Sequence, residues 1–218
     1  MGKLHWVKGH IMKRFIKHTA IAAMLAGGLA LGSVAHADDH LLSEKVAAGD
    51  YKMDTAHGYV TFSYSHFGLS NPQISFKGVD ANITLDTETP ANSSVNVTIQ
   101  ANSIDSDVEV FNDHLNSANW FDTEKFPEIT FVSTELVQGD EHSKGTLTGD
   151  LTIKGITKSV TLDVTLLGAI EHPLSKKDTL GVEATTTVLR SEFDMGAYGQ
   201  AVSDEIEITI SGEFNKVG

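Results

Sequence analysis

The fold is best read from residues 147–166, which run LTGDLTIKGITKSVTLDVTL. Apolar side chains occupy alternate positions on both sides of the central KGITK, first at Leu147, Leu151 and Ile153 and then from Val160 to Leu166. A period of two is typical of a strand with one face buried and the other in water. The central residues are few enough to form a hairpin. These residues therefore predict two adjacent antiparallel strands.

The same alternation recurs along most of the chain. Spacing typical of βαβ units is absent, so a parallel sheet is not expected. Eight short antiparallel strands form either a closed barrel or a two-sheet sandwich, and closure removes exposed edges. The inward positions hold small or medium side chains, which leave room for an apolar cavity. The six further strands are predicted at residues 59–66, 79–86, 95–102, 129–137, 182–188 and 206–211.

One segment departs from this period. Residues 107–118 place apolar side chains three, four and three residues apart, from Val108 to Ala118, which is a helical stripe. Ser106 and Glu109 have the spacing of a capping box at its start. The sequence thus predicts a single helix between the third and fourth strands.

The first 37 residues differ from the others in charge. They hold five basic side chains and no acidic one, whereas residues 38–218 have a net charge of −18. Basic residues precede an apolar run at 19–34 and then Ala35-His36-Ala37, the pattern of a secretory signal peptide cleaved after Ala37. The run is shorter than the ~20 residues that span a bilayer, so no stable membrane anchor is expected after cleavage.

This interpretation divides the chain into three parts. Residues 1–37 are the predicted signal peptide, of which residues 1–11, ahead of Met12, are either a start-site artefact or a long basic region. Residues 38–50 are polar and are expected to be a flexible lead-in, and residues 51–218 are expected to form the barrel. The periplasm is the expected location.

Composition excludes several kinds of site. The chain has no cysteine, which removes disulfides, thiolate metal sites and cysteine nucleophiles. The net charge of residues 38–218 argues against binding to nucleic acid or to an anionic membrane surface through bulk electrostatics. Catalytic motifs such as Gly-x-Ser-x-Gly, His-Glu-x-x-His or a phosphate-binding loop are also absent. We therefore expect no enzyme and no cofactor.

One metal site depends on processing. Cleavage after Ala37 would leave Asp38-Asp39-His40 at the N-terminus. A free amine, two deprotonated amides and the His40 imidazole make a tetragonal nitrogen set that suits Cu(II) or Ni(II). The sequence predicts copper binding there in vitro, and no other metal site.

Two histidines occupy different positions in the first strand. His66 shares the parity of Val60 and should point inward, either as a hydrogen-bond partner for a ligand head group or as an ordinary buried histidine. His57 has the opposite parity and follows Asp54 by three residues. For His57 we expect a structural hydrogen bond near the strand entry, close to Asp54, rather than a ligand site.

Two further polar residues have more than one interpretation. His114 lies one residue off the helical stripe and is expected to be exposed, to bond a loop carbonyl or to contact a ligand. Arg190 is the only arginine after residue 37 and is expected to pair with one of the many acids or to contact a ligand head group. Trp120 and Phe121 are expected to anchor the helix and to form part of the pocket wall.

Motifs spread along the chain resemble those of the YceI-like family of exported bacterial proteins. The resemblance covers residues 51–214 in the expected order. The motifs are YKMD with a histidine at 51–57, SID at 103–105, HLNSANWFD at 114–122, FPEITF at 126–131, GDLTIKGIT at 149–157, RSEF at 190–193 and VSDEI at 202–206.

The resemblance implies a lipocalin-like antiparallel barrel with a long apolar pocket that binds polyisoprenoid lipids, such as a polyprenylated quinone precursor. Phe111 and Asn112 stand where many members have Arg-Asp, which favours a neutral head group. Asp194 stands where glycine is common. The ligand-contacting residues are expected to be Val60, Phe62, Tyr64, His66, Phe111, Leu115, Trp120, Phe121, Phe131, Leu151, Val188 and Arg190.

The leading hypothesis is an exported, non-catalytic binding protein for a polyisoprenoid or similar long-chain lipid, serving isoprenoid quinone metabolism, transport or storage. A homodimer is left open. One alternative is an enzyme acting on a prenyl lipid, which requires a convergent polar pair in the pocket with His66 as its best candidate. Another is an envelope stress or interaction module without a lipid, which predicts a filled barrel and an exposed apolar patch.

Overall fold

The structure is a computed structural model that describes residues 47–218. The predicted signal peptide, the predicted copper site at His40 and residues 38–46 of the predicted lead-in lie outside this range. The first strand, β1, begins at Gly49, so Gly49 and Asp50 belong to the barrel and not to the lead-in. Within the described range, no helix is long and apolar enough to cross a bilayer.

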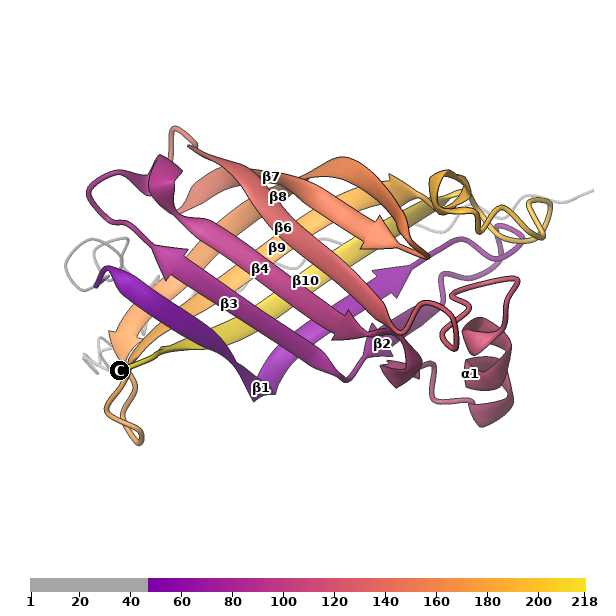
Figure 1. The fold of residues 1–218 in the computed structure, drawn as a ribbon, viewed down its shortest axis with the longest axis horizontal. Coiled ribbons are helices and arrows are strands. Elements are labelled where there is room, and N and C mark those ends of the chain that lie inside the picture. The colour runs from indigo at the N-terminus through magenta and orange to yellow at the C-terminus, as the bar shows by residue number, and fades with distance from the viewer. Residues whose placement is uncertain (1–46) are drawn as a thin grey trace, which may run out of the picture. The chain divides into compact units, whose positions relative to one another are not determined.

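Eight strands form a closed antiparallel barrel (Figure 1). Each strand pairs with the next around the ring, and β10 pairs with β1 to close it. This confirms the predicted all-β barrel over the two-sheet sandwich. The ring consists, in order, of β1 (Gly49–Ser63), β3 (Val79–Leu85), β4 (Ser94–Gln100), β6 (Glu128–Gln138), β7 (Lys144–Ile153), β8 (Ile156–Glu171), β9 (Asp178–Leu189) and β10 (Glu205–Lys216).

Two short strands were not predicted. β2 (Gln73–Phe76) pairs with the last four residues of β1, and β5 (Ile104–Asp105) pairs with β2. They have room because β1 pairs with β3 only along its first residues, Gly49 to Lys52. Segments of four and two residues are too short to show an alternating pattern. The predicted first strand also ran to His66, whereas β1 ends at Ser63.

The helix α1 (Glu109–Asn116) lies between the third and fourth barrel strands, as predicted. The predicted capping box is wrong, because Val108 is the N-cap residue and makes no side-chain capping hydrogen bond. Instead, Asn112 Oδ1 accepts a hydrogen bond from the Ser106 backbone N–H at 2.8 Å and lies 2.6 Å from Ser106 Oγ. Within residues 47–218, the short 3₁₀ helices are η2 (Pro90–Asn92), η3 (Ala101–Ser103) and η4 (Arg190–Phe193).

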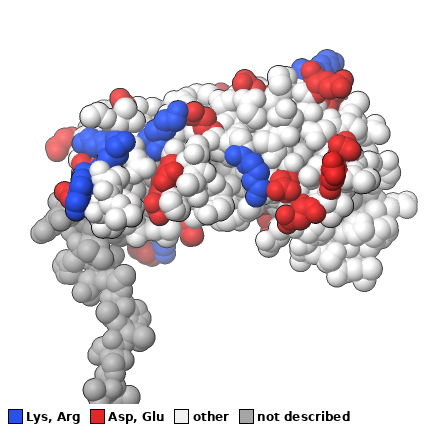
Figure 2. All heavy atoms as spheres, turned by 90° about the horizontal axis from the view of Figure 1, so that it is seen from below, with Lys and Arg blue, Asp and Glu red and all other residues white. Residues whose placement is uncertain are grey.

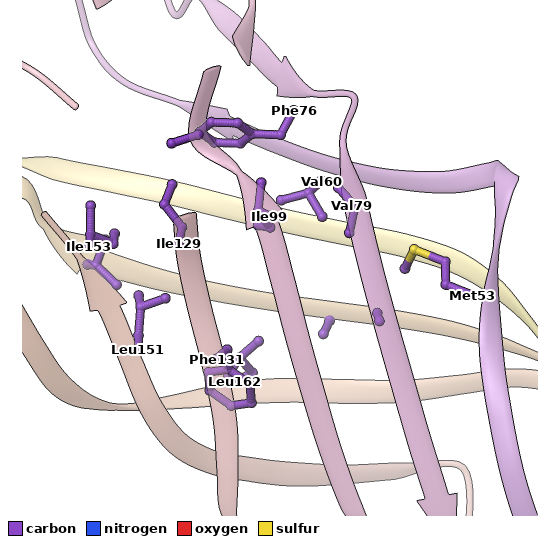
Figure 3. Close-up of a cluster of buried hydrophobic side chains, with 14 of the residues drawn as sticks. Met53, Val60, Phe76, Val79, Ile99, Ile129, Phe131, Leu151, Ile153 and Leu162 are labelled. Atoms are coloured by element: carbon purple, nitrogen blue, oxygen red, sulfur yellow. The ribbon is translucent and has the colours of Figure 1, made fainter. Parts of the chain in front are cut away.

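Apolar side chains from alternate strand positions point into the barrel (Figure 3). The buried side chains include Val60 of β1, Ile99 of β4 and Leu162 of β8, which come from widely separated parts of the sequence. Gly149 of β7 faces Phe131 of β6, and a Cβ atom at Gly149 would lie 2.4 Å from Phe131 Cζ. Only glycine leaves space for that ring, so the inward position of Phe131 depends on its neighbour.

The two ends of the barrel are built differently (Figure 1). One, here called the helix end, consists of residues 64–72, 101–127 and 190–204 and carries α1 and η4. The other, here called the hairpin end, consists of the connections at residues 86–93, 139–143 and 172–177.

Candidate functional site

The barrel encloses a cavity of about 1380 Å³. All eight barrel strands contribute to its wall, for example through Val97, Leu147 and Ile208. The wall also includes residues of both the helix end and the hairpin end, so the cavity extends along the barrel. It arises because the inward positions hold medium side chains, too small to fill the interior of an eight-stranded ring. The barrel is therefore not filled, contrary to the expectation for an interaction module.

Every residue predicted to contact a ligand lines this cavity. That contact itself stays a prediction. The lining residues include Val60, Phe62, Tyr64, His66, Phe111, Leu115, Trp120, Phe121, Phe131, Leu151, Val188 and Arg190.

An aromatic cluster attaches the helix segment to the barrel. The ring of Phe121 meets that of Phe76 edge to face, with centroids 5.6 Å apart, and that of Phe62 at 6.1 Å. Leu115, on the inner side of α1, is only 2% exposed. Trp120 and Phe121 are both buried, as predicted for residues that anchor the helix. The helix end of the cavity is thus walled by packed rings.

A hydrogen bond between two rings connects α1 with the segment that follows it. The Trp120 indole Nε1–H donates to His114 Nε2 at 2.8 Å, and Tyr198 stacks on Trp120 with centroids 6.0 Å apart. Because Nε2 accepts, a neutral His114 carries its proton on Nδ1. The bonding partner of His114 is therefore an indole and not the loop carbonyl that was one of the expectations.

Arg190 does not pair with an acid, so the predicted salt bridge is wrong. Its side chain is 3% exposed, and its guanidinium donates to the backbone carbonyl groups of Met195, Ala197 (2.7 Å), Val202 (2.9 Å) and Ser203 (2.8 Å). These bonds use four of the five N–H groups of an arginine. Arg190 thus holds the loop between η4 and β10 in place and has one N–H left for any ligand.

The charge of Arg190 lies against an aromatic face. Its guanidinium carbon is 5.6 Å from the Trp120 ring centroid, within the range of a cation–π interaction. Trp120 thereby contacts His114, Tyr198 and Arg190 together, which joins α1 to the loop after η4. No sequence pattern indicated this arrangement, since the segments 114–120 and 190–198 are far apart along the chain.

Two further contacts fix the same loop. Asp194 has a φ of 57°, the left-handed conformation that favours glycine. The buried Lys154 Nζ donates to the Asp194 carbonyl at 2.9 Å. Hydrogen bonds from the Ser191 side chain and backbone to Asp204, at 2.7 and 2.9 Å, lower the pKa of that carboxyl.

His66 lies at the edge of the cavity and is exposed, so it is not the buried histidine that was one of its two interpretations. The backbone around it bridges to Ser70 and Val202. Within residues 47–218 its ring meets the ring of Phe67, with centroids 4.7 Å apart, and has no side-chain hydrogen-bond partner. The convergent polar pair required by the enzyme alternative is therefore not formed around His66.

His57 makes the predicted contact with Asp54, outside the barrel. His57 Nδ1 lies 2.8 Å from Asp54 Oδ2 at a bulge of β1. The hydrogen bond to Asp54 and the charge of Glu213 raise the pKa of His57, and the hydrogen bond from His57 lowers the pKa of Asp54. Neither residue lines the cavity.

The fold and the cavity define a class of protein, a closed antiparallel barrel with a long apolar interior. The model of the YceI-like domain matches residues 51–214. The chain belongs to the YceI-like family. It is 37% identical to protein YceI of Escherichia coli O157:H7 over 169 residues, covering 76% of this chain and 86% of that protein.

Other relatives agree with this assignment. A UPF0312 protein of Enterobacter sp. strain 638 is 36% identical over 188 residues, covering 85% of this chain and 94% of that protein. The crystal structure of BcnA from Burkholderia cenocepacia superposes with a TM-score of 0.67 at 27% identity, over 74% of this chain and 98% of that one.

A more distant structure shares the fold. It is described as a polyisoprenoid binding domain from Saccharophagus degradans implicated in plant cell wall breakdown, and it superposes with a TM-score of 0.55 at 13% identity. The matched region covers 78% of this chain and all of that domain.

Proposed function

We propose that this protein is an exported, non-catalytic carrier that holds a long-chain lipid of the polyisoprenoid type inside its barrel. The observation that carries the proposal is the cavity of about 1380 Å³, walled by apolar side chains from every barrel strand. Burial in such a space is favourable for hydrocarbon in proportion to the area removed from water.

The size of the cavity suits a long ligand. Its volume of about 1380 Å³ exceeds the roughly 300–1,000 Å³ of a pocket for a drug-sized molecule. The Saccharophagus degradans domain is described as polyisoprenoid binding, and its common fold with this chain is compatible with such a ligand.

The polar groups near the cavity favour a neutral head group. Arg190 is the only guanidinium of the described residues and donates to four carbonyl groups. It therefore has little capacity to bind a phosphate. His114 and Tyr198 line the same region and offer single hydrogen bonds to a hydroxyl or carbonyl.

The export of the protein and its lack of catalysis, the two other parts of the proposal, depend on different observations. The basic and apolar residues before Ala37 support export to the periplasm. The absence of a side-chain partner for His66, within the described range, supports binding over catalysis.

The test is to extract protein purified without detergent and to analyse the extract by mass spectrometry. We expect a recurring prenyl lipid of limited chain length. An Ala184→Trp variant, which places a bulky ring inside the cavity, should lose most of it, whereas Thr185→Trp should keep it, because Thr185 is the exposed neighbour on the outer face of β9. Thr186→Phe, also at the cavity wall, serves as a second obstructed variant if Ala184→Trp unfolds.

An extract of the wild type that contains no lipid, together with no saturable binding of a prenyl lipid, would refute the proposal. Equal loss in Ala184→Trp and Thr185→Trp would place the lipid outside the barrel. Thermal unfolding of each variant shows that the comparison is made between folded proteins.

A further inference from the structure

Two loops at the helix end contain no charged side chain. Residues 55–76 include no Asp, Glu, Lys or Arg, and neither do residues 195–203, in a chain of which 21% of residues are charged. The loop 64–72 lies within the first of these segments, and the second lies between η4 and β10. Figure 2 shows an area free of charged side chains at this end of the barrel, at the lower right.

Large apolar side chains stand on both loops in water. Phe67 is 61% exposed, Leu69 86% and Tyr198 56%. Phe67 and Tyr198 also have φ angles of 54° and 58°, in the left-handed region that is unfavourable for bulky residues. Phe67 meets His66 edge to face and Tyr198 stacks on Trp120, yet both residues stay more than half exposed. Strained residues that stay exposed indicate a function outside the isolated molecule.

The two loops form one unit. Phe67 N–H donates to the Ala201 carbonyl at 2.8 Å, and Ser203 N–H donates to the Ser65 carbonyl at 3.0 Å. Ser65 N–H in turn donates to Ser203 Oγ at 2.9 Å. We call this unit, residues 64–72 and 195–203, the lip. Its second loop is held from inside by Arg190, so the exposed rings keep a fixed position.

The lip stands at the cavity. His66, Tyr198 and Ala201 belong to the lip and also line the cavity wall. The cavity is therefore continuous with a rigid, uncharged and partly aromatic surface. Aromatic and aliphatic side chains of this kind partition into the interface of a bilayer.

We propose that the lip docks on the surface of a zwitterionic lipid bilayer by inserting Phe67, Leu69 and Tyr198. A lipid then passes between the bilayer and the cavity without crossing water. The proposal rests on the lipid cargo of the proposed function, since only a bilayer can supply such a cargo at the cavity edge.

The charge around the lip selects the type of bilayer. Asp107, Glu109 and Asp113 lie exposed in and just before α1, and the ring of Tyr198 is 6.2 Å from that of His114 in the same helix. These acids oppose an anionic surface. Docking is therefore expected on vesicles of phosphatidylcholine alone and is expected to weaken as phosphatidylglycerol is added.

The experiment measures co-flotation of the protein, as recovered from cells, with phosphatidylcholine vesicles. A Phe67→Ser, Leu69→Ser, Tyr198→Ser triple variant should lose more than about tenfold in partitioning, from the apolar area removed. The matched control is Val137→Ser, Ile170→Ser, Leu174→Ser, three exposed apolar residues of the hairpin half. The control should bind as the wild type does. All forms have the same N-terminus, so differences between them report on the lip.

The outcomes separate this proposal from the proposed function. Equal flotation of the triple variant and the wild type, or equal loss in the control, would overturn docking through the lip. A Phe67→Ser, Leu69→Ser variant, whose two positions are not in the cavity wall, should still yield lipid on extraction but should exchange it with vesicles more slowly than the wild type. If the wild type floats through its lip yet yields no lipid, the docking stands and the cargo is wrong.

Discussion

The helix end and the hairpin end close the same barrel by different means. At the helix end, buried polar groups bind backbone carbonyls and rings, as Arg190 and Trp120 do. At the hairpin end, the contacts are exposed ion pairs such as Lys144 with Glu141 at 2.9 Å and Lys176 with Glu171 at 3.8 Å. Exposed ion pairs contribute little to stability. The residues of the helix end therefore hold one another in defined positions around the cavity, whereas the hairpin end mainly connects strands.

The largest expected effect is at Arg190. Arg190→Met removes the donors of four carbonyl groups from a buried position, which should lower the free energy of unfolding by about 3–5 kcal/mol. Urea denaturation measures this change. Arg190→Lys should recover only part of it, because an ammonium group cannot reach all four acceptors. A loss below about 1 kcal/mol in Arg190→Met would show that the loop does not depend on the guanidinium.

The second effect compares one leucine from each end. Leu115→Ala should lower the free energy of unfolding by about 2–4 kcal/mol, because Leu115 is 2% exposed and lies on the inner side of α1. Leu174→Ala at the hairpin end should change stability by less than about 0.5 kcal/mol, since Leu174 is 88% exposed. Thermal or urea unfolding of both variants tests the difference. Similar costs at the two sites would remove the contrast between the ends.

A smaller effect of opposite sign is expected at the lip. Phe67→Gly relieves the left-handed strain at φ 54° and exposes less apolar surface. Glycine also gains freedom in the unfolded chain, so the net gain in stability should be at most about 1 kcal/mol. Flotation with vesicles should fall in the same variant. A variant that is both less stable and unchanged in flotation would contradict the account of the strain.

The smallest effect concerns pH and the exposed pair of Asp54 and His57. The raised pKa of His57 means that its contribution is complete below its ordinary value of 6.5 and is lost as the pH rises through the raised value. The lowered pKa of Asp54 means that its contribution is present above 3.8 and is lost as the pH falls through the lowered value. The pair therefore contributes most between pH 3.8 and 6.5.

An NMR titration of the His57 ring in Asp54→Asn measures this pair directly. The pKa of His57 should fall towards its ordinary value. An unchanged pKa of His57 would assign its shift to Glu213, the next cause of the increase.

The barrel could be predicted because its strands repeat one local pattern. Alternation at Leu147, Leu151 and Ile153 reflects only whether each side chain faces the interior, and that depends on backbone geometry alone. Alternation likewise placed Val60 on the cavity wall. His66 had the same parity, but β1 ends before it. The end of a strand depends on which residues pair with it, and the alternation of side chains gives no information about that.

The helix end could not be predicted in the same way. The expectation for Arg190 followed from the abundance of acids, whereas its partners are carbonyl groups of a loop that it shapes itself. The Trp120 to His114 bond depends on a turn of the chain after α1. Contacts of this kind are set by tertiary packing, for which spacing along the sequence carries no signal.

The pairing that closes the ring has a consequence for the order of events during folding. β1 pairs with β10, so Tyr51 lies opposite Lys216, almost the full length of the described chain away. Contacts between such distant residues form slowly, because the entropy cost of closing a long loop precedes the stabilisation that the contacts provide. The cavity does not exist until the last strand has been synthesised and has found the first. A ligand inside the barrel therefore requires β10, and a protein truncated before Glu205 is expected to hold no ligand.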